Sequence, residues 1–387
     1  MSSDRFQVLA LSGGGYRGLY TATILAEVER EIGGPIARHF DLIAGTSIGG
    51  ILALAIASEI PAQAIVDLFK KHGEAIFNPR TSMPIFKSTF SSDELKKQIS
   101  TPEMLGTKLL GDCLHPVVIP SINYSTGKPV LFKTPHHESF RRDHQHSMVD
   151  IALATSAAPT YFPRHQFQHN QYVDGGLFAN APGLLALHEA ETFFDVVSSD
   201  IHLLSIGTMS SKFTVNPKNN REGGAMDWGG GNPLKAAQRL FGLSISVQES
   251  LCDFMLQHKL GSRYMHVDED LTDDRSKAVA LDKADIHAQE VLIGSGLEKA
   301  KTCLGKTDFM EFLAHRIQDL AAPASGVPIE LTAVEVGARF RDREMVSLDI
   351  SEYGDPLHTR TLRVPFSFYH KPTQLGWAGR EADCPPL

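Results

Sequence analysis

Residues 40–57 read Phe-Asp-Leu-Ile-Ala-Gly-Thr-Ser-Ile-Gly-Gly-Ile-Leu-Ala-Leu-Ala-Ile-Ala. Phe40–Ala44 is a short apolar run typical of a buried strand, and Ile51–Ala57 is typical of an apolar helix. The residues between them form a Gly-x-Ser-x-Gly motif, which presents a nucleophilic serine on a sharp strand-to-helix turn. Gly45 and Gly49 are needed there because a side chain at either position would collide with neighbouring chain. The segment therefore predicts an α/β fold with Ser47 as candidate nucleophile.

Strands and helices alternate on both sides of this segment. Upstream, the apolar run Phe6–Leu11 precedes a helical pattern over Leu19–Ile32, which Gly33-Gly34-Pro35 ends. Downstream, we expect a helix of small residues over Met148–Ala158. Further strands are expected at Val117–Pro120, Pro129–Phe132, Tyr172–Gly176 and Ile201–Gly207, the last being the final strand of the core. This rhythm predicts a three-layer α/β hydrolase core with a mainly parallel sheet over residues 7–208.

The composition changes after residue 208. Glycine clusters at 223–224 and 229–231 indicate a loop, and a helical pattern then runs from Pro233 to about Leu320. Residues 321–328 are linker-like, and the final residues alternate as β-segments do, for example over Thr361–Phe366. We therefore expect a helical region over 209–325 and a small β-rich appendage over 326–387.

A run of three glycines follows the first strand, within Gly13-Gly14-Gly15-Tyr16-Arg17-Gly18. This run satisfies the dinucleotide fingerprint Gly-x-Gly-x-x-Gly, but that function needs an acidic residue near the end of the next strand. The next strand ends instead in Ala44-Gly45. The alternative is an oxyanion hole, in which backbone N–H groups stabilise the alkoxide of a tetrahedral intermediate and Arg17 adds charge or braces the loop. A plain glycine-rich turn would not explain three glycines beside a serine turn.

The general base is the next question. The chain has 17 histidines, yet none follows a strand among small neighbours, and His136, His137, His144 and His146 lie in a polar loop expected to be solvated rather than metal-binding. In contrast, Asp174-Gly175-Gly176 places a carboxylate at a strand end with no side chains behind it. A carboxylate can accept a serine proton if burial raises its pKa toward the working range. We expect no metal and no cofactor.

Composition limits the classes of function. The 387 residues are 42% hydrophobic and carry a net charge of −8. A nucleic-acid binder needs a dense cluster of basic residues to neutralise phosphates, so this composition argues against that class of function. The four cysteines are far apart, as expected for free thiols in an intracellular protein. No apolar run approaches the roughly 20 residues that span a bilayer. Without a signal-peptide pattern, we expect a cytoplasmic protein with peripheral membrane contact at most.

Four sequence blocks together resemble the patatin-like phospholipase family. The blocks are Ser12–Gly18, Gly45–Gly50, Ser156–Phe162, and Asp174-Gly175-Gly176 with Asn180 and Pro182 after it. The resemblance implies a Ser47–Asp174 dyad without a catalytic histidine, with the oxyanion held by the amides of Gly14 and Gly15. Ala181 departs from the family, many members of which carry a second asparagine there, and this leaves the chemistry intact.

Within that family, the opening block and residues 32–61 are most similar to bacterial phospholipase effectors of cyclic-oligonucleotide anti-phage systems (CBASS). This implies hydrolysis of membrane phospholipids at the inner face of the membrane, with a cyclic nucleotide as activator. Two alternatives stay open: a constitutive non-lipid esterase or thioesterase, and a non-catalytic lipid-binding scaffold. Association into a homo-oligomer is also left open.

The activator is expected to bind outside the catalytic core. The helical region after Pro233 and the glycine-containing loop Lys212–Asn232 are the candidate places. Lys218, Arg221 and Lys235 could meet phosphate charge there, although basic residues in loops are usually solvated.

Phe77, Phe86 and Phe90 lie in an irregular segment with interspersed serines and prolines. They either cap the mouth of the site or belong to the core. The acidic segment Asp268–Asp274 lacks the glycine of a calcium loop and is expected to be solvated surface.

Overall fold

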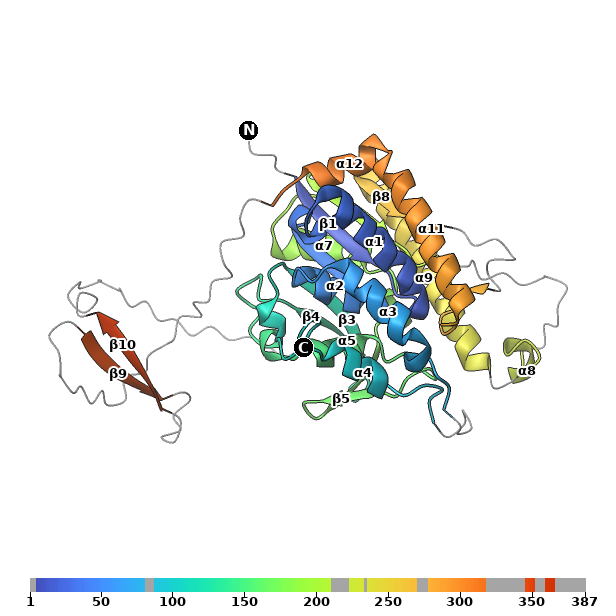
Figure 1. The fold of residues 1–387 in the computed structure, drawn as a ribbon, viewed down its shortest axis with the longest axis horizontal. Coiled ribbons are helices and arrows are strands. Elements are labelled where there is room, and N and C mark those ends of the chain that lie inside the picture. The colour runs from blue at the N-terminus through green and yellow to red at the C-terminus, as the bar shows by residue number, and fades with distance from the viewer. Residues whose placement is uncertain are drawn as a thin grey trace, which may run out of the picture. The chain divides into compact units, whose positions relative to one another are not determined.

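An eight-stranded mixed sheet organises the first part of the chain (Figure 1). The structure, a computed structural model, describes residues 5–80, 87–209, 223–232, 235–269 and 278–317, and the backbone of two strands at 345–351 and 359–365. Residues 1–323 form one compact unit and residues 324–387 a second. The strands of the large sheet are β1 (Phe6–Leu11), β2 (Leu42–Gly45), β3 (Val117–Asn123), β4 (Lys128–Lys133), β5 (His165–Phe167), β6 (Asn170–Asp174), β7 (Ile201–Ile206) and β8 (Tyr264–Val267).

The central strands of the sheet are parallel. The order is β5-β6-β3-β2-β1-β7-β8, and β4 pairs with β3 as a branch. The pairs β3–β2, β2–β1, β1–β7 and β7–β8 are parallel, whereas β3–β4, β3–β6 and β5–β6 are antiparallel. The predicted α/β class with a mainly parallel sheet is confirmed.

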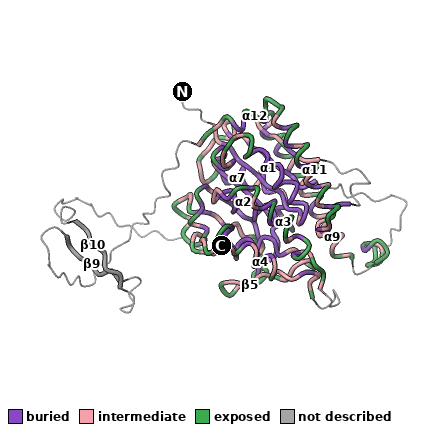
Figure 2. Tube along the Cα trace, in the orientation of Figure 1, coloured by how far each residue is buried: buried purple, intermediate pink, exposed green. Residues whose placement is uncertain are grey.

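Alternate residues of the strands feed two separate apolar cores. Leu9 and Ile43 face one core, while their neighbours Val8 and Leu42 face the other, as the period of two in a strand requires. Helices α1 (Gly18–Ile32), α2 (Ile48–Ala57), α3 (Ala62–Ile76), α5 (Met148–Thr155) and α11 (Ile286–Leu304) contribute to the first core. Helices α7 (Gly183–Phe193) and α9 (Ala236–Leu260) contribute to the second. Buried residues follow the strands between these helical layers (Figure 2). The three layers therefore arise because the central strands are apolar on both faces.

The helices over 18–32, 48–57 and 148–155 and those after residue 235 overlap segments predicted to be helical, whereas the helices over 62–76, 93–99, 176–179, 183–193 and 225–228 were not predicted. The described α-helices are α1 (Gly18–Ile32), α2 (Ile48–Ala57), α3 (Ala62–Ile76), α4 (Asp93–Ile99), α5 (Met148–Thr155), α6 (Gly176–Ala179), α7 (Gly183–Phe193), α8 (Ala225–Trp228), α9 (Ala236–Leu260), α11 (Ile286–Leu304) and α12 (Thr307–Ala314). Gly33 ends α1 in the left-handed conformation, with φ of 70°.

The prediction that the core sheet ends at Gly207 is wrong. Strand β8 pairs in parallel with β7, with Leu203 opposite Tyr264, and α11 packs on α1. Residues 209–317, as far as they are described, therefore belong to the same compact unit as the core. The helical periodicity of α9 and α11 dominates the sequence pattern of this region, so the four-residue strand β8 between them was not predicted. In the second unit, β9 (Met345–Ser351) and β10 (Thr359–Pro365) pair antiparallel.

Candidate active site

Ser47 lies on the turn between β2 and α2, in a backbone conformation that only a constrained site maintains. Its φ is 56° and its ψ is −124°, a region rarely occupied by residues other than glycine. The Ser47 N–H donates to Thr155 Oγ1 at 3.0 Å, and Thr155 Oγ1 donates to the Pro120 carbonyl at 2.6 Å. A Cβ at Gly49 would lie 2.2 Å from the Leu11 carbonyl oxygen, so this close approach requires glycine. The predicted serine turn is thus present and is braced from α5.

Asp174 meets Ser47 across the sheet. Ser47 Oγ donates to Asp174 Oδ2 at 2.7 Å, and the Gly176 N–H donates to Asp174 Oδ1 at 2.7 Å. The pairing of Ser121 in β3 with Asp174 at the end of β6 sets this position. Asp174 is only 1% exposed, and burial raises its pKa from 3.8 to about 7, more than its two hydrogen bonds lower it. A carboxylate with this pKa can accept a serine proton near neutral pH.

Within the described part of the chain, only two backbone N–H groups of the glycine run are available to stabilise an oxyanion, and the other residues of the run support the loop. The Gly13 N–H donates to the Asn180 carbonyl at 3.0 Å, and the Gly18 N–H donates to carbonyls within the loop. Arg17 is buried and its Nη1 donates to the Met209 carbonyl at 3.2 Å, so it braces the loop. Gly14 and Gly15 line the cavity beside Ser47, and their N–H groups have no acceptor among the described residues. Gly13 and Gly18 therefore support the loop, because their N–H groups already donate to carbonyls of the chain and are not free to hold an oxyanion.

Asn180 connects the glycine loop to α9. Its Nδ2 donates to the Gly13 carbonyl at 3.1 Å and to Glu249 Oε1 at 2.8 Å. Its own N–H donates to Gln248 Oε1 at 3.1 Å, while Gln248 Nε2 donates to the Leu177 carbonyl at 2.8 Å. Gln248 and Glu249 therefore fix the segment that follows Asp174. Sequence reasoning missed both residues because a glutamine and a glutamate on a long helix carry no local signal.

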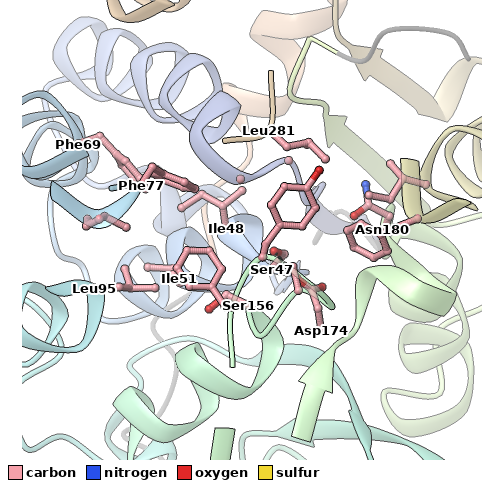
Figure 3. A pocket seen from close by; sticks show the side chains of 18 residues that line it. Ser47, Ile48, Ile51, Phe69, Phe77, Leu95, Ser156, Asp174, Asn180 and Leu281 are labelled. Atoms are coloured by element: carbon pink, nitrogen blue, oxygen red, sulfur yellow. Dashed lines mark hydrogen bonds between the residues drawn. The ribbon is translucent and has the colours of Figure 1, made fainter. Parts of the chain in front are cut away.

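An apolar cavity opens beside Ser47 (Figure 3). Ile48, Ile51, Phe69 and Phe77 line one part of it. Leu281, together with Phe241 and Ile245 of α9, lines another part, and so does Tyr161. The cavity has a volume of about 50 Å³. Since one water needs about 10–15 Å³ by this measure, it has room for a few waters.

The three phenylalanines predicted near the mouth have different positions. Phe77 lines the cavity, whereas Phe90 is buried and its ring centroid lies 5.6 Å from that of Phe77. Phe90 also packs on Phe162 at 5.6 Å. Phe90 is therefore core, as the alternative interpretation held. Phe86 lies outside the described residues.

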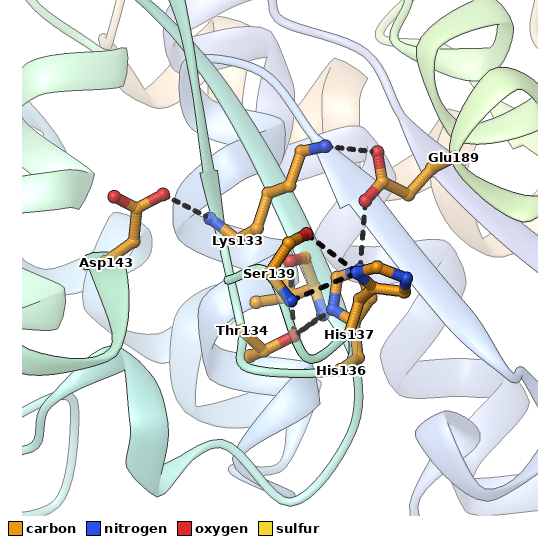
Figure 4. A network of polar contacts seen from close by, with 8 residues as sticks. Lys133, Thr134, His136, His137, Ser139, Asp143 and Glu189 are labelled. Atoms are coloured by element: carbon orange, nitrogen blue, oxygen red, sulfur yellow. Dashed lines mark hydrogen bonds and ion pairs between the residues drawn. The ribbon is translucent and has the colours of Figure 1, made fainter. Parts of the chain in front are cut away.

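The polar loop with four histidines is not simply solvated surface. His136 Nε2 bonds with Glu189 Oε1 at 3.0 Å, and Lys133 Nζ pairs with Glu189 Oε2 at 2.6 Å (Figure 4). Glu189 is fully buried, and the His136 ring stacks on Phe194 with centroids 4.9 Å apart. Packing against α7 thus buries the side chain of His136, which its polar sequence neighbours predicted to be exposed to solvent. No cluster of three metal-binding side chains occurs in the described part of the chain.

The residues expected to meet an activator are only partly described. Lys218 and Arg221 lie outside the described residues, and Lys235 is exposed at the start of α9. Of the acidic segment, residues 270–274 are likewise outside. Asp268 is a structural acceptor, because its Oδ1 receives the Met209 N–H at 2.8 Å.

Known proteins share both the motif blocks and most of the chain length. A family model described as patatin-like phospholipase matches residues 9–187. A cGAMP-activated phospholipase of Pseudomonas aeruginosa is 45% identical over 317 residues, which cover 80% of this chain and 92% of the relative. Proteins of the same name are 34% identical in Vibrio cholerae (77% of this chain, 91% of the relative) and 35% identical in Escherichia coli (78% and 90%).

None of the described helices has both the length and the apolar character needed to cross a membrane. The match to the family model coincides with the strands and helices that hold Ser47, Asp174 and the glycine loop. The relatives extend the similarity well beyond residue 187, through the region that contains α9. The chain belongs to the patatin-like phospholipase family.

Proposed function

We propose that this chain is a phospholipase that releases fatty acids from membrane phospholipids and is activated by a cyclic dinucleotide. The observation that carries the proposal is the 2.7 Å hydrogen bond from Ser47 to a buried carboxylate at the wall of an apolar cavity. Three relatives that cover most of the chain are named cGAMP-activated phospholipases. We infer that the chain works at the inner face of the membrane as an effector of anti-phage defence.

The reaction would proceed in two halves. Ser47 Oγ attacks the ester carbonyl carbon while Asp174 Oδ2 accepts the serine proton, and the N–H groups of Gly14 and Gly15 donate to the resulting oxyanion. Collapse expels the alcohol, which takes the proton from Asp174 and leaves an acyl group on Ser47. Water then attacks the acyl carbon and gives a proton to Asp174. The second collapse returns that proton to Ser47 Oγ and frees the fatty acid.

A resting enzyme with a closed site would explain the need for an activator. The cavity beside Ser47 has a volume of only about 50 Å³, so widening it would ease the entry of an acyl chain. Phe241 and Ile245 of α9 form part of its wall, so a ligand that binds better to a form with α9 displaced would raise the active population. Such control would keep the enzyme from degrading its host's own membrane.

The test is fatty-acid release from phospholipid vesicles, measured by mass spectrometry with and without cGAMP. We expect release that needs cGAMP and is lost in Ser47→Ala, while Ser47→Ala unfolds at the same temperature as the parent. Release without any nucleotide would leave a constitutive lipase. Cleavage of soluble esters or thioesters alone would favour a non-lipid esterase, and vesicle binding without turnover would favour a scaffold. Light scattering with and without cGAMP measures whether a homo-oligomer forms.

A further inference from the structure

Large apolar side chains are exposed along the outer face of α9. The exposed fractions are 45% for Leu240, 56% for Val247, 54% for Leu251, 66% for Phe254 and 45% for Met255. Single exposed apolar residues are common on soluble proteins, but a group on one helix marks an interaction surface. Within the described part of the chain, nothing packs over them. We call these five residues the α9 stripe.

The spacing of the α9 stripe makes it continuous along the helix. Leu240, Val247 and Phe254 are seven residues apart, and Leu251 lies four residues after Val247, so these residues share one side of α9. The opposite side carries the buried residues of α9, which pack on the core. The helix is therefore apolar on two sides, which packing against the core alone does not require.

The α9 stripe lies on the same helix as the wall of the candidate active site. Phe241 and Ile245, the neighbours of Leu240 and Val247 in the sequence, line the cavity beside Ser47. The short helix α8 packs on α9 and exposes Trp228, a residue enriched where proteins meet the surface of a membrane.

Charge also suits a lipid surface. Exposed Lys235 stands just before α9, whereas Lys259 in its last turn is already paired with Glu191 at 2.8 Å. Of the carboxylates in α9, Glu249 accepts from Asn180 and Asp253 is half-buried. An apolar helix face with a basic residue at its border can lie in a membrane interface.

We propose that the α9 stripe docks on the phospholipid bilayer that holds the substrate. The proposal rests on the proposed function, which places the substrate in a membrane. A second copy of the chain is the competing occupant, because steps of three and four residues also suit a helix partner. The bilayer is favoured because the stripe shares its helix with the cavity wall, and because Trp228 and Lys235 extend the surface with an aromatic and a basic residue.

The experiment measures binding separately from turnover. Full-length chain carrying Ser47→Ala is sedimented with vesicles of phosphatidylethanolamine and phosphatidylglycerol, with and without cGAMP. The test variant adds Val247→Ser, Leu251→Ser and Phe254→Ser. The matched control adds Leu114→Ser, Val197→Ser and Ile286→Ser, which replace side chains that are 51%, 60% and 62% exposed elsewhere on the chain. Unfolding temperatures confirm that both variants fold.

We expect the test variant to lose vesicle affinity by about tenfold or more, and the control to bind as the parent does. With Ser47 restored, the test variant should lose vesicle hydrolysis but keep hydrolysis of a soluble short-chain ester. Equal vesicle binding by the test and control variants, or no binding by the parent in either condition, would overturn the proposal. A parent dimer that only the test variant dissociates would assign the surface to a second copy instead. Failure of the proposed function would appear separately, as absent ester hydrolysis by a chain that still binds vesicles.

Discussion

Replacing Asp174 by asparagine should abolish ester hydrolysis and, above pH 7, make the folded chain more stable. The carboxylate is 1% exposed and accepts hydrogen bonds only from Ser47 and Gly176 among the described residues. Burial in an apolar cavity therefore disfavours its ionised form more than these two donors favour it. The asparagine Oδ1 can accept from the Gly176 N–H while its Nδ2 donates to Ser47 Oγ, and the side chain carries no charge, so the substitution removes both the base and the penalty of burying it.

The size of the effect follows from the two pKa values of Asp174. Burial raises the pKa from 3.8 to about 7 in the folded chain. At about 1.4 kcal/mol for each tenfold change, the ionised carboxylate lowers the free energy of unfolding by at most about 4 kcal/mol. Because the folded pKa is the higher one, the unfolded chain loses its proton first as the pH rises. The stability conferred by the neutral carboxyl is thus complete below about pH 4, decreases between about pH 4 and 7, and is absent above.

The measurement is urea unfolding of the parent and Asp174→Asn at several values between pH 5 and 8. The gain in stability of Asp174→Asn should increase with pH and level off above about 7, while hydrolysis of a soluble ester by the parent increases over the same interval. Asp67→Asn is the control, because Asp67 is an exposed carboxylate and should give no such trend. An Asp174→Asn protein that is no more stable than the parent at pH 8, or whose gain is the same at every pH, would refute the reasoning.

Three further outcomes are expected. Gly15→Ala should reduce kcat about a hundredfold while the chain still folds. The loop must shift because Gly15 has φ of 57° and a Cβ there would lie 2.1 Å from the Leu281 carbonyl oxygen. An unchanged kcat would remove Gly15 from the oxyanion hole. Gln248→Ala should lower kcat about tenfold with little change in KM, since Gln248 positions the segment after Asp174. The control Ser250→Ala, on the exposed side of α9, should change neither kcat nor KM. A rise in KM alone for Gln248→Ala would contradict a positioning role. Glu189→Gln should destabilise the fold by about 3 kcal/mol, because it leaves the ammonium group of Lys133 without its ion pair, while ester hydrolysis by the folded protein is retained; an unaltered unfolding midpoint would contradict this.

Glycine-flanked motifs made the centre of the fold predictable. At Ser47 and Asp174, the chain must turn sharply beside a strand end, and only a few local sequences allow that, so the motif reports the geometry directly. Strand β8 and the burial of His136 depend instead on partners far along the chain, namely Leu203 and Glu189. A four-residue strand or a histidine in a polar loop carries no sign of such a partner, so local patterns predicted neither.

Several features also converge on one helix, which lies in the part of the chain that the sequence separates from the core as a helical region over 209–325. Helix α9 supplies Phe241 to the cavity wall, holds Asn180 through Gln248, and exposes the α9 stripe on its outer side. Any displacement of α9 that widens the cavity must therefore also change the support of the glycine loop through Asn180. If the lipid on the stripe and the activator both bind more tightly when α9 is displaced, each ligand must raise the affinity of the other by the same factor. Comparing cGAMP affinity with and without vesicles, and vesicle affinity with and without cGAMP, in Ser47→Ala protein tests this equality. Independent binding of the two ligands would mean that α9 does not couple them.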